Sequence, residues 1–304
     1  MDAAIRSTVV MAVIFVIAQL GALFMISSSI LGPQDRAFSN PNDPLIPIIY
    51  IGVIVLFTFA VIYIIRKKRE DIIRFIFLGA VAFTIFYVFS VIAVKFTDSL
   101  LALIVPVALT AVLIYFLVKK PEWYVVDASG ILMAIGVIGI FGISLNILPV
   151  FVLLIVLAIY DAISVYGTKH MVSLADGVTQ MKLPILLVIP KRTGYSYLKQ
   201  KPLKQQIESG EEREAMFMGL GDVIIPGVLV ASAFNSLSPS GSDNLFVAFG
   251  TLIGAVAGFA LLMRFVLRGN PQAGLPLLNG GAIIGYLVTY LIVFKDLSFG
   301  LVLG

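Results

Sequence analysis

The chain of 304 residues contains no cysteine, a single histidine and few charged side chains. Without cysteine, neither a disulfide framework nor a thiolate nucleophile or metal ligand can form. Charged residues make up only 12% of the chain and hydrophobic residues 60%, whereas a soluble domain carries roughly 25% charged residues. Together with a mean hydropathy of +1.07, this composition excludes a soluble globular enzyme and indicates a polytopic membrane protein.

Long apolar runs take the place of a globular core, because about 20 apolar residues in a helix span a bilayer. We predict a single all-α, polytopic membrane domain over 1–304 with nine transmembrane helices. The first span has no small-residue cleavage site, so we expect a membrane helix rather than a removed signal peptide. The predicted spans are 7–31, 44–65, 72–94, 99–118, 124–145, 147–167, 215–237, 244–267 and 275–294.

Lysine and arginine are distributed unequally between the two ends of these spans. All of them lie on one side except Arg36, Lys95 and Lys295. Since positively charged loops stay in the cytoplasm, nine spans place the N-terminus inside and the C-terminus outside. We therefore predict helices one to six over 1–166, a cytoplasmic loop over 167–214 and helices seven to nine over 215–304, in a multi-pass protein of the cell membrane.

Two aspartates interrupt the apolar runs, Asp161 in the sixth span and Asp222 in the seventh. A carboxylate in hydrocarbon costs several kcal/mol, which marks an acid at this depth as a candidate functional site. Counted from the predicted helix ends, both lie roughly 9–10 Å inside the cytoplasmic boundary. A structural explanation would pair each acid with a basic residue or a backbone group. No lysine or arginine lies at a comparable depth in any span.

Two carboxylates on neighbouring antiparallel helices can share one proton and titrate as a pair. Such a dyad suits amide hydrolysis, because the ionised member activates water while the protonated member polarises the scissile carbonyl. The chemistry needs no metal and no other cofactor. Gly219 and Gly221 remove side-chain bulk beside Asp222, so a helix or a substrate backbone could approach closely. Asp127, a few residues into the fifth span, is expected at the membrane interface.

The residues around the two aspartates carry recognisable motifs. Tyr160-Asp161 and Gly219-Leu220-Gly221-Asp222 resemble the YD and GxGD motifs of the presenilin/signal peptide peptidase family of intramembrane aspartyl proteases. The third motif of that family is PAL. Its counterpart here is Ala273-Gly274-Leu275-Pro276, which keeps the leucine and the following proline and replaces the first proline and the alanine. The resemblance covers mainly residues 150–290.

The resemblance implies a presenilin-like fold and cleavage of single-span membrane proteins within the lipid bilayer by Asp161 and Asp222. It also implies active-site support or substrate contacts from Tyr160, Gly219, Leu220, Gly221, Ala273, Gly274, Leu275 and Pro276. Tyr160 could hydrogen-bond the dyad, line the substrate path or only pack. The compact length resembles that of microbial, in particular archaeal, homologues, which act without the partner subunits of presenilins. A homo-oligomer is left open, and no nucleic-acid partner is implied.

Residues 183–190 form an apolar stretch within the predicted loop that is too short to cross a membrane. An intramembrane protease must unwind its substrate and satisfy the freed backbone groups, which strand addition can do. We predict a substrate-binding strand, with 275–278 as a second edge; a gate plug at the interface is the alternative. The predicted strand residues are Leu183, Pro184, Ile185, Leu186, Leu187 and Val188. His170, in the same loop, is expected to be exposed and without a role.

Three other functions stay open at this stage: a proton- or ion-coupled transporter, a prepilin-type GxGD peptidase and an inactive homologue. Against a transporter stand the absence of a detectable repeat and the position of both acids away from the bilayer midplane. Prepilin-type peptidases usually carry a lysine soon after the motif aspartate, whereas Val223, Ile224 and Ile225 follow Asp222 here.

Two further classes of intramembrane protease are excluded. The chain has no HExxH motif, and one histidine cannot build the usual catalytic zinc site. The stretch Asp127-Ala128-Ser129-Gly130 lacks the glycine of a GxSG serine-nucleophile motif, and no histidine within a span can act as its base.

Overall fold

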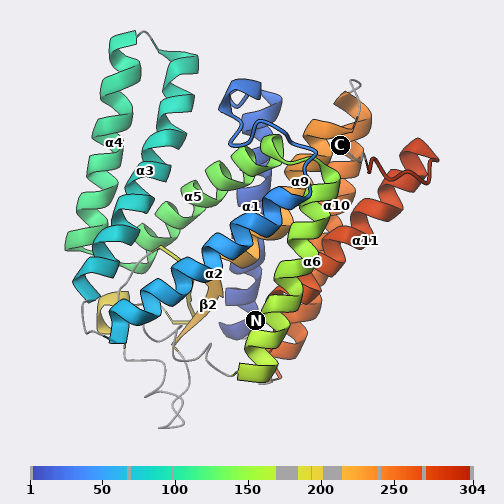
Figure 1. Cartoon of the computed structure of the whole chain (residues 1–304). Helices are drawn as coiled ribbons and strands as arrows, with labels where there is room; N and C mark the ends of the chain where they lie inside the picture. The colour runs from blue at the N-terminus through green and yellow to red at the C-terminus, as the bar shows by residue number, and fades with distance from the viewer. Residues whose placement is uncertain are drawn as a thin grey trace.

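The structure is a computed structural model of the chain, and it describes residues 3–66, 70–97, 99–168, 184–192, 194–200, 214–237, 241–268 and 272–301. Within these residues it contains nine α-helices and one small sheet (Figure 1). The helices are α1 (Ala3–Ser27), α2 (Leu45–Arg66), α3 (Glu70–Phe96), α4 (Ser99–Lys119), α5 (Trp123–Ser144), α6 (Ile147–Ile163), α9 (Leu220–Ser236), α10 (Gly241–Val266) and α11 (Gly274–Phe294). The strands are β1 (Leu186–Pro190) and β2 (Ala215–Gly219).

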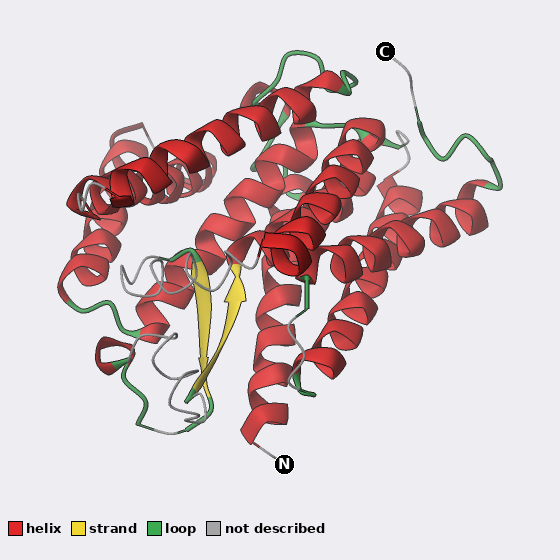
Figure 2. Ribbon diagram, turned by 60° about the horizontal axis from the view of Figure 1, so that its bottom comes forward, coloured by secondary structure: helices red, strands yellow, loops and turns green. Residues whose placement is uncertain are grey.

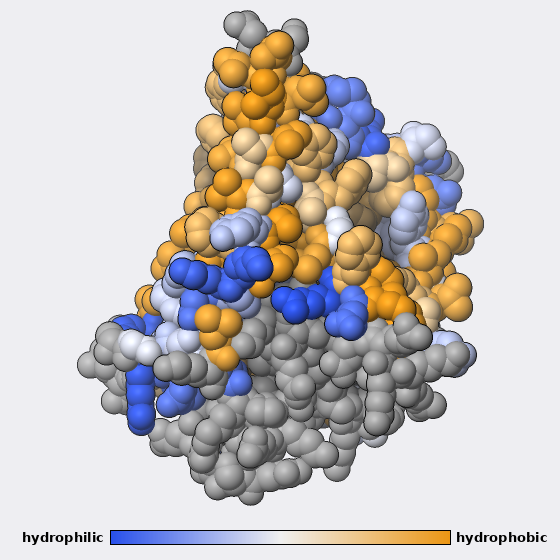
Figure 3. Space-filling model, turned by 90° about the vertical axis from the view of Figure 1, so that its left-hand side faces the viewer, coloured by the Kyte–Doolittle hydropathy of each residue, from blue (hydrophilic) through white to orange (hydrophobic). Residues whose placement is uncertain are grey.

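The helices have the apolar surface of a multi-pass membrane protein. By length and composition, seven helices of the described part could cross a membrane: α1, α3, α4, α5, α6, α10 and α11. The other two are apolar as well, over the shorter stretches Leu45–Ile54 and Leu220–Ser236. Large apolar side chains such as Phe75 and Phe83 are more than 70% exposed. Figure 3 shows hydrophobic side chains over much of the upper part of one face, with a band of hydrophilic ones below them and further hydrophilic groups at the upper right.

The centre of the bundle is formed by α5 and α9, and α9 also packs against α1, α10 and α11. A small residue permits the close approach, since a Cβ at Gly142 of α5 would lie 2.3 Å from Cβ of Ala231 in α9. Helices α3 and α4 stand beside this centre as a pair (Figure 1). The described chain starts at the end of the bundle that carries the sheet and leaves at the opposite end (Figures 1 and 2). This arrangement agrees with an odd number of membrane crossings.

Helices α10 and α11 approach each other through glycines. A Cβ at Gly254 would lie 2.2 Å from the carbonyl oxygen of Gly281, and a Cβ at Gly258 would lie 2.3 Å from that of Leu277. Neither distance leaves room for a methyl group, so the two backbones are in direct contact here. The contact at Gly258 fixes the first turns of α11 and thereby the segment that enters the candidate active site.

The start of the predicted seventh span departs from the prediction. Residues 215–219 were expected to be helical, but they form β2, which pairs antiparallel with β1, and α9 begins only at Leu220. The ladder is flanked by hydrogen bonds from Leu220 N to Ile185 O and from Lys191 N to Glu214 O. Pairing with β1 satisfies backbone groups that both segments would otherwise expose. The expectation that Asp222 lies well inside a helix is therefore wrong, because it belongs to the first turn of α9.

The apolar stretch 183–190 contains β1. Leu186, Leu187 and Val188 belong to this strand, and Pro184 and Ile185 form the turn before it. Leu183 and His170 lie outside the described residues. Figure 2 shows the two strands beside the helices at one end of the bundle. Residues 275–278, expected as a second edge, are helical and open α11, so that expectation is wrong.

Candidate active site

Asp161 lies near the end of α6 and is only 7% exposed. Its Oδ2 accepts a hydrogen bond from the backbone N–H of Leu275 at 3.0 Å, and the N–H of Gly274 faces the same carboxylate. The first amides of a helix need acceptors, and Ala273 at the N-cap of α11 offers no side-chain cap. Asp161 therefore caps α11 from another helix. Of the structural explanations for this acid, pairing with backbone groups is the one observed.

Asp222 occupies the first turn of α9 and is partly buried. The backbone N–H of Gly219 faces its carboxylate. On the other side lies Gly274, where a Cβ would be 3.3 Å from Asp222 Oδ2. Gly274 and Leu275 are consecutive residues, and they contact Asp222 and Asp161 respectively. The two carboxylates thus meet at the start of α11 and are close enough to interact electrostatically.

The two carboxylates contact the segment Ala273–Pro276, the counterpart of the PAL motif. Ala273 is buried at the N-cap, and Gly274, Leu275 and Pro276 form the first turn of α11. A proline in the first turn costs little, because its missing N–H would lack a helical partner in any case. A side chain at Gly274 would press on Asp222. The residues that depart from the family motif are therefore compatible with the local geometry.

Contacts between helices hold the two carboxylates in place. Asn279 Nδ2 donates to the carbonyl oxygen of Leu154 at 2.9 Å and ties α11 to α6. Ser232 Oγ donates to the carbonyl oxygen of Leu145 at 2.7 Å and ties α9 to the junction between α5 and α6. These side chains are buried, so the hydrogen bonds are shielded from water and restrict the sliding of the helices.

The two glycines of the GxGD motif lie in different surroundings. Gly219 is the N-cap of α9, with extended backbone angles of φ −61° and ψ 135°, and it contacts Asp222. Gly221 is exposed, and a Cβ there would have nothing within 4 Å. Leu220 between them is buried. The face of α9 beside Asp222 therefore borders open space at Gly221, on which a substrate backbone could lie.

The structure gives different positions to two tyrosines near Asp161. Tyr160 is 49% exposed, and no hydrogen bond of its hydroxyl is found among the described residues. Tyr166, which the sequence reasoning left without a role, donates its hydroxyl to Gln272 Oε1 at 2.7 Å and accepts from Ala273 N at 3.4 Å. It lies in the π-helical turn η2 (Ser164–Thr168) and ties the end of α6 to the entrance of α11.

Asp127 lies near the start of α5, as expected for an acid a few residues into the fifth span, and it is buried, at 5% exposure. Its Oδ1 accepts a hydrogen bond from Val188 N at 2.7 Å, which fixes β1 against α5. The acid is covered because the sheet packs onto the first turns of α5. The two segments are far apart in the sequence, and nothing in the sequence predicts this contact. Asp127 thus supports the sheet and does not join Asp161 and Asp222.

Comparisons with known proteins identify the family of the chain. Residues 12–294 match the family model described as "Signal-peptide peptidase, presenilin aspartyl protease". Signal peptide peptidase-like 2A of Mus musculus is 27% identical over 153 residues, which cover 46% of this chain and 27% of that protein. The matched stretch thus spans about a quarter of the length of this curated relative.

Solved structures extend the similarity to nearly the whole chain. A presenilin family intramembrane aspartate protease in space group C222 is 31% identical, with a TM-score of 0.70 over 94% of this chain and 99% of that chain. A structure described in the same words, in space group P2, is 34% identical, with a TM-score of 0.62 over 93% and 96%. The fold is therefore presenilin-like, and the chain belongs to the signal-peptide peptidase/presenilin family of aspartyl proteases.

Proposed function

We propose that the chain is an intramembrane aspartyl protease, and that Asp161 and Asp222 are its general acid–base pair. The observation that carries the proposal is the meeting of two carboxylates from α6 and α9 at the start of α11, within otherwise apolar helices. Membership in a family of aspartyl proteases supports the same reaction. The alternative transporter and prepilin-type functions have no comparable support.

The reaction needs one water molecule between the two carboxylates. One carboxylate takes a proton from this water, which attacks the carbonyl carbon of the scissile peptide, while the protonated partner donates to the carbonyl oxygen. When the tetrahedral intermediate collapses, the carboxyl that took the proton from water donates it to the leaving nitrogen, and the other carboxylate regains a proton from a hydroxyl group of the intermediate. The pair thereby returns to its starting protonation state, and no covalent intermediate forms.

The substrate is proposed to add to β2 rather than to β1. Hydrogen-bonded and non-hydrogen-bonded pairs alternate in an antiparallel ladder, and the pair Val188 and Phe217 is of the second kind. Both residues therefore point their backbone N–H and C=O away from the partner strand. On β1 this outer edge is occupied, since Val188 N donates to Asp127 and Pro190 has no N–H.

The outer edge of β2 leads directly to the dyad. Phe217 and Gly219 point their backbone groups outward, and the N–H of Gly219 already faces Asp222. In the part of the chain that the structure describes, no hydrogen bond to the outward groups of Phe217 is found. An extended substrate segment paired with this edge would satisfy its own freed backbone groups and arrive beside Asp222.

The sidedness of the protein follows from its charge distribution. We propose a cytoplasmic N-terminus, helices one to six over 1–166, a cytoplasmic loop over 167–214 and an outside C-terminus after the last three helices. Substrates would then be single-span membrane proteins whose N-termini lie outside. The protein is proposed to act without partner subunits, as a monomer or a homo-oligomer, in the manner of a microbial, archaeal-type homologue.

The dyad is tested with purified protein in detergent and a single-span reporter substrate. Asp161→Asn and Asp222→Asn should each abolish cleavage, whereas Asp71→Asn, at an exposed acid in the first turn of α3, should leave it unchanged. The wild type should show a bell-shaped dependence of rate on pH, because one carboxyl must be ionised and the other protonated. Retention of cleavage by both dyad variants would contradict the assignment. An inert wild type that responds in an ion-flux assay would favour a transporter.

The substrate edge is tested by proline substitutions, which remove one N–H from a chosen edge. Phe217→Pro should strongly reduce cleavage, because it removes an outward donor of β2. Leu186→Pro acts on the outer edge of β1 and should retain most of the activity. The reverse outcome would move the substrate to β1, and unchanged cleavage by both variants would refute strand addition.

A further inference from the structure

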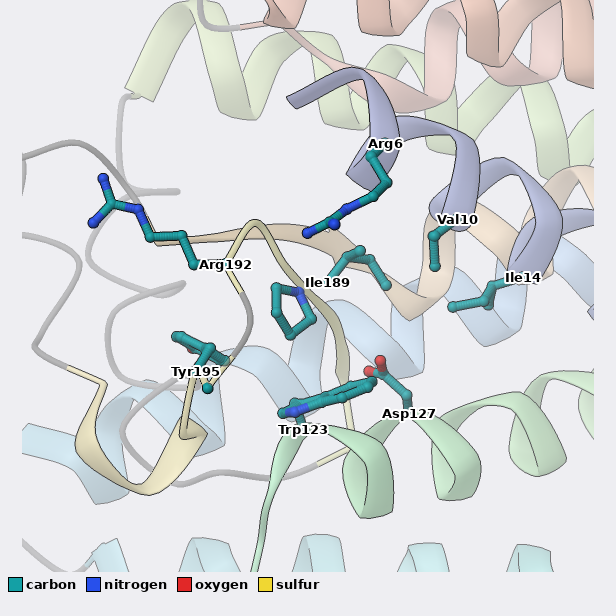
Figure 4. Close-up of a pocket in the computed structure, with 10 residues that line it drawn as sticks. Arg6, Val10, Ile14, Trp123, Asp127, Ile189, Arg192 and Tyr195 are labelled. Carbon is teal, nitrogen blue, oxygen red and sulfur yellow. The ribbon is translucent and has the colours of Figure 1, made fainter. Parts of the chain in front are cut away.

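A cavity of about 400 Å³ lies between α1, α5 and the end of β1, apart from the two aspartates of the dyad (Figure 4). Its lining combines a buried acid with two arginines, two aromatic rings and an apolar wall. The polar and aromatic residues are Arg6, Trp123, Asp127, Arg192 and Tyr195. A cavity of this size is within the range that binds small molecules and cofactors.

Asp127 brings an unused hydrogen-bond acceptor into this cavity. Its Oδ1 accepts from Val188 N, but Oδ2 has no hydrogen-bond partner within the described residues, although the side chain is only 5% exposed. Figure 4 shows the carboxylate directed into the cavity beside the ring of Trp123. A buried oxygen of this kind needs a donor. A ligand with an ammonium group would provide both the N–H and the opposite charge.

The mouth of the same cavity carries positive charge. Arg6 reaches from α1 towards the cavity, and its Nη2 donates to the carbonyl oxygen of Lys191 at 3.1 Å, which fixes the side chain there (Figure 4). A guanidinium has five N–H donors, so Arg6 retains several for an anion. Arg192 borders the cavity from the segment after β1. The cavity thus offers an acceptor in its depth and cationic donors at its opening.

Part of the apolar wall of the cavity is formed by α1. Val10 is 43% exposed and Ile14 is half-buried, and both follow Arg6 along this helix. Trp123 is the first residue of α5 and also lines the cavity. Tryptophan side chains favour the boundary between membrane and water. A molecule with a zwitterionic head and an aliphatic chain would match the order of acid, arginine and apolar wall.

We propose that this cavity binds a phospholipid whose headgroup carries a primary ammonium. The ammonium donates to Asp127 Oδ2, the phosphate accepts from Arg6, and an acyl chain follows Val10 and Ile14. A choline headgroup has no N–H and leaves Asp127 Oδ2 without a donor. A purely anionic headgroup places no positive charge beside Asp127. The cavity should therefore select ethanolamine-type lipids over both.

The wild-type protein itself allows the first test. Purified protein is exchanged into equal amounts of phosphatidylethanolamine, its N-methyl and N,N-dimethyl derivatives and phosphatidylcholine, and the retained lipids are quantified by native mass spectrometry. The protein should retain each lipid whose headgroup ammonium still carries an N–H. Retention should fall roughly tenfold for phosphatidylcholine, because the last methylation removes the charge-assisted hydrogen bond to Asp127. An equal retention of all four lipids would overturn the proposal.

Variants separate the two halves of the headgroup site. Asp127→Asn keeps an oxygen for Val188 N and places an NH2 group at Oδ2, so the preference for ethanolamine over glycerol headgroups should be lost. Arg6→Gln should weaken all phospholipids alike. Arg264→Gln, at an exposed arginine in the last turn of α10, serves as the matched control and should change nothing. An unchanged lipid preference in Asp127→Asn would refute the role of this acid.

A soluble headgroup distinguishes a lipid from a free phosphorylated amine. Phosphoethanolamine should compete only weakly with the lipid, because it has no chain to contact Val10 and Ile14. Competition at concentrations equal to the lipid would overturn the lipid as the occupant and assign the cavity to a soluble molecule.

Discussion

Replacing Gly258 by alanine tests whether the packing of α10 on α11 sets the geometry of the dyad. The added Cβ would lie 2.3 Å from Leu277 O and 3.2 Å from Leu278 Cα. Both are backbone atoms, so no side-chain rotation can relieve the contact. Moving Leu277 O from 2.3 Å to the shortest distance at which real Cβ atoms are found, 3.0 Å, displaces it by about 0.7 Å.

This displacement acts close to the two carboxylates. Leu277 lies in the same first turns of α11 as Gly274 and Leu275. The N–H of Leu275 holds Asp161, and Gly274 contacts Asp222. A misplacement of about 1 Å costs roughly a hundredfold in rate. We therefore expect kcat to fall roughly tenfold to a hundredfold, or about 1.4–2.7 kcal/mol of transition-state stabilisation. The chain should still fold, since alanine is favoured over glycine in a helix by about 1 kcal/mol, which offsets part of the strain.

The assay measures kcat and KM on the single-span reporter together with the midpoint of thermal unfolding. Gly280→Ala is the matched control, because a Cβ at Gly280 of α11 has nothing within 4 Å. It should keep the wild-type kcat and unfold at the same or a slightly higher temperature. The reasoning is refuted if Gly258→Ala retains the wild-type kcat, or if Gly280→Ala loses as much activity.

Three further predictions concern other contacts. Tyr166→Phe should lower the cleavage rate several-fold, since it removes the hydrogen bond to Gln272 at 2.7 Å, whereas Tyr160→Phe removes no described hydrogen bond and should have less effect on the same rate. Gly221→Leu should raise KM for the reporter without lowering the unfolding temperature, because it fills open space beside Asp222. Burial raises the pKa of Tyr197 above its ordinary value of 10.0, so the contribution of this residue to stability should be complete below pH 10.0 and decrease above it. The midpoint of thermal unfolding should therefore fall less with rising pH in Tyr197→Phe than in the wild type.

The helical class, the number of helices in the described part of the chain and the choice of Asp161 and Asp222 as candidate site residues could be predicted because each depends on local composition. Apolar runs define membrane helices wherever they occur. An acid within such a run is costly, so Asp161 and Asp222 stand out against their neighbours without any knowledge of the fold. The break between α5 and α6 at Leu145 and Asn146 was also expected, because it falls between two of the predicted apolar spans.

The features that were missed depend on contacts between distant segments. Residues 215–219 are apolar and precede a helix, so only their pairing with β1 distinguishes them from its first turns. The burial of Asp127 likewise results from the sheet that covers α5. The glycine contacts between α10 and α11 did leave a signal, because Gly250, Gly254 and Gly258 recur every four residues. That spacing predicts close packing, but it does not identify the partner helix.

The cap that Asp161 places on α11 couples the active site to the fold. A carboxylate at a helix N-terminus stabilises that end by about 0.3–1 kcal/mol when exposed and up to about 2 kcal/mol when partly buried. Asp161 therefore aligns α11 as well as taking part in the proposed reaction. Asp161→Asn retains an oxygen that can accept from Leu275 N, whereas Asp161→Ala removes the cap. Both variants should be inactive, but only the alanine variant should also loosen the start of α11, which hydrogen exchange of the Leu275 amide can detect. Equal protection of this amide in the two variants would show that Asp161 does not align α11.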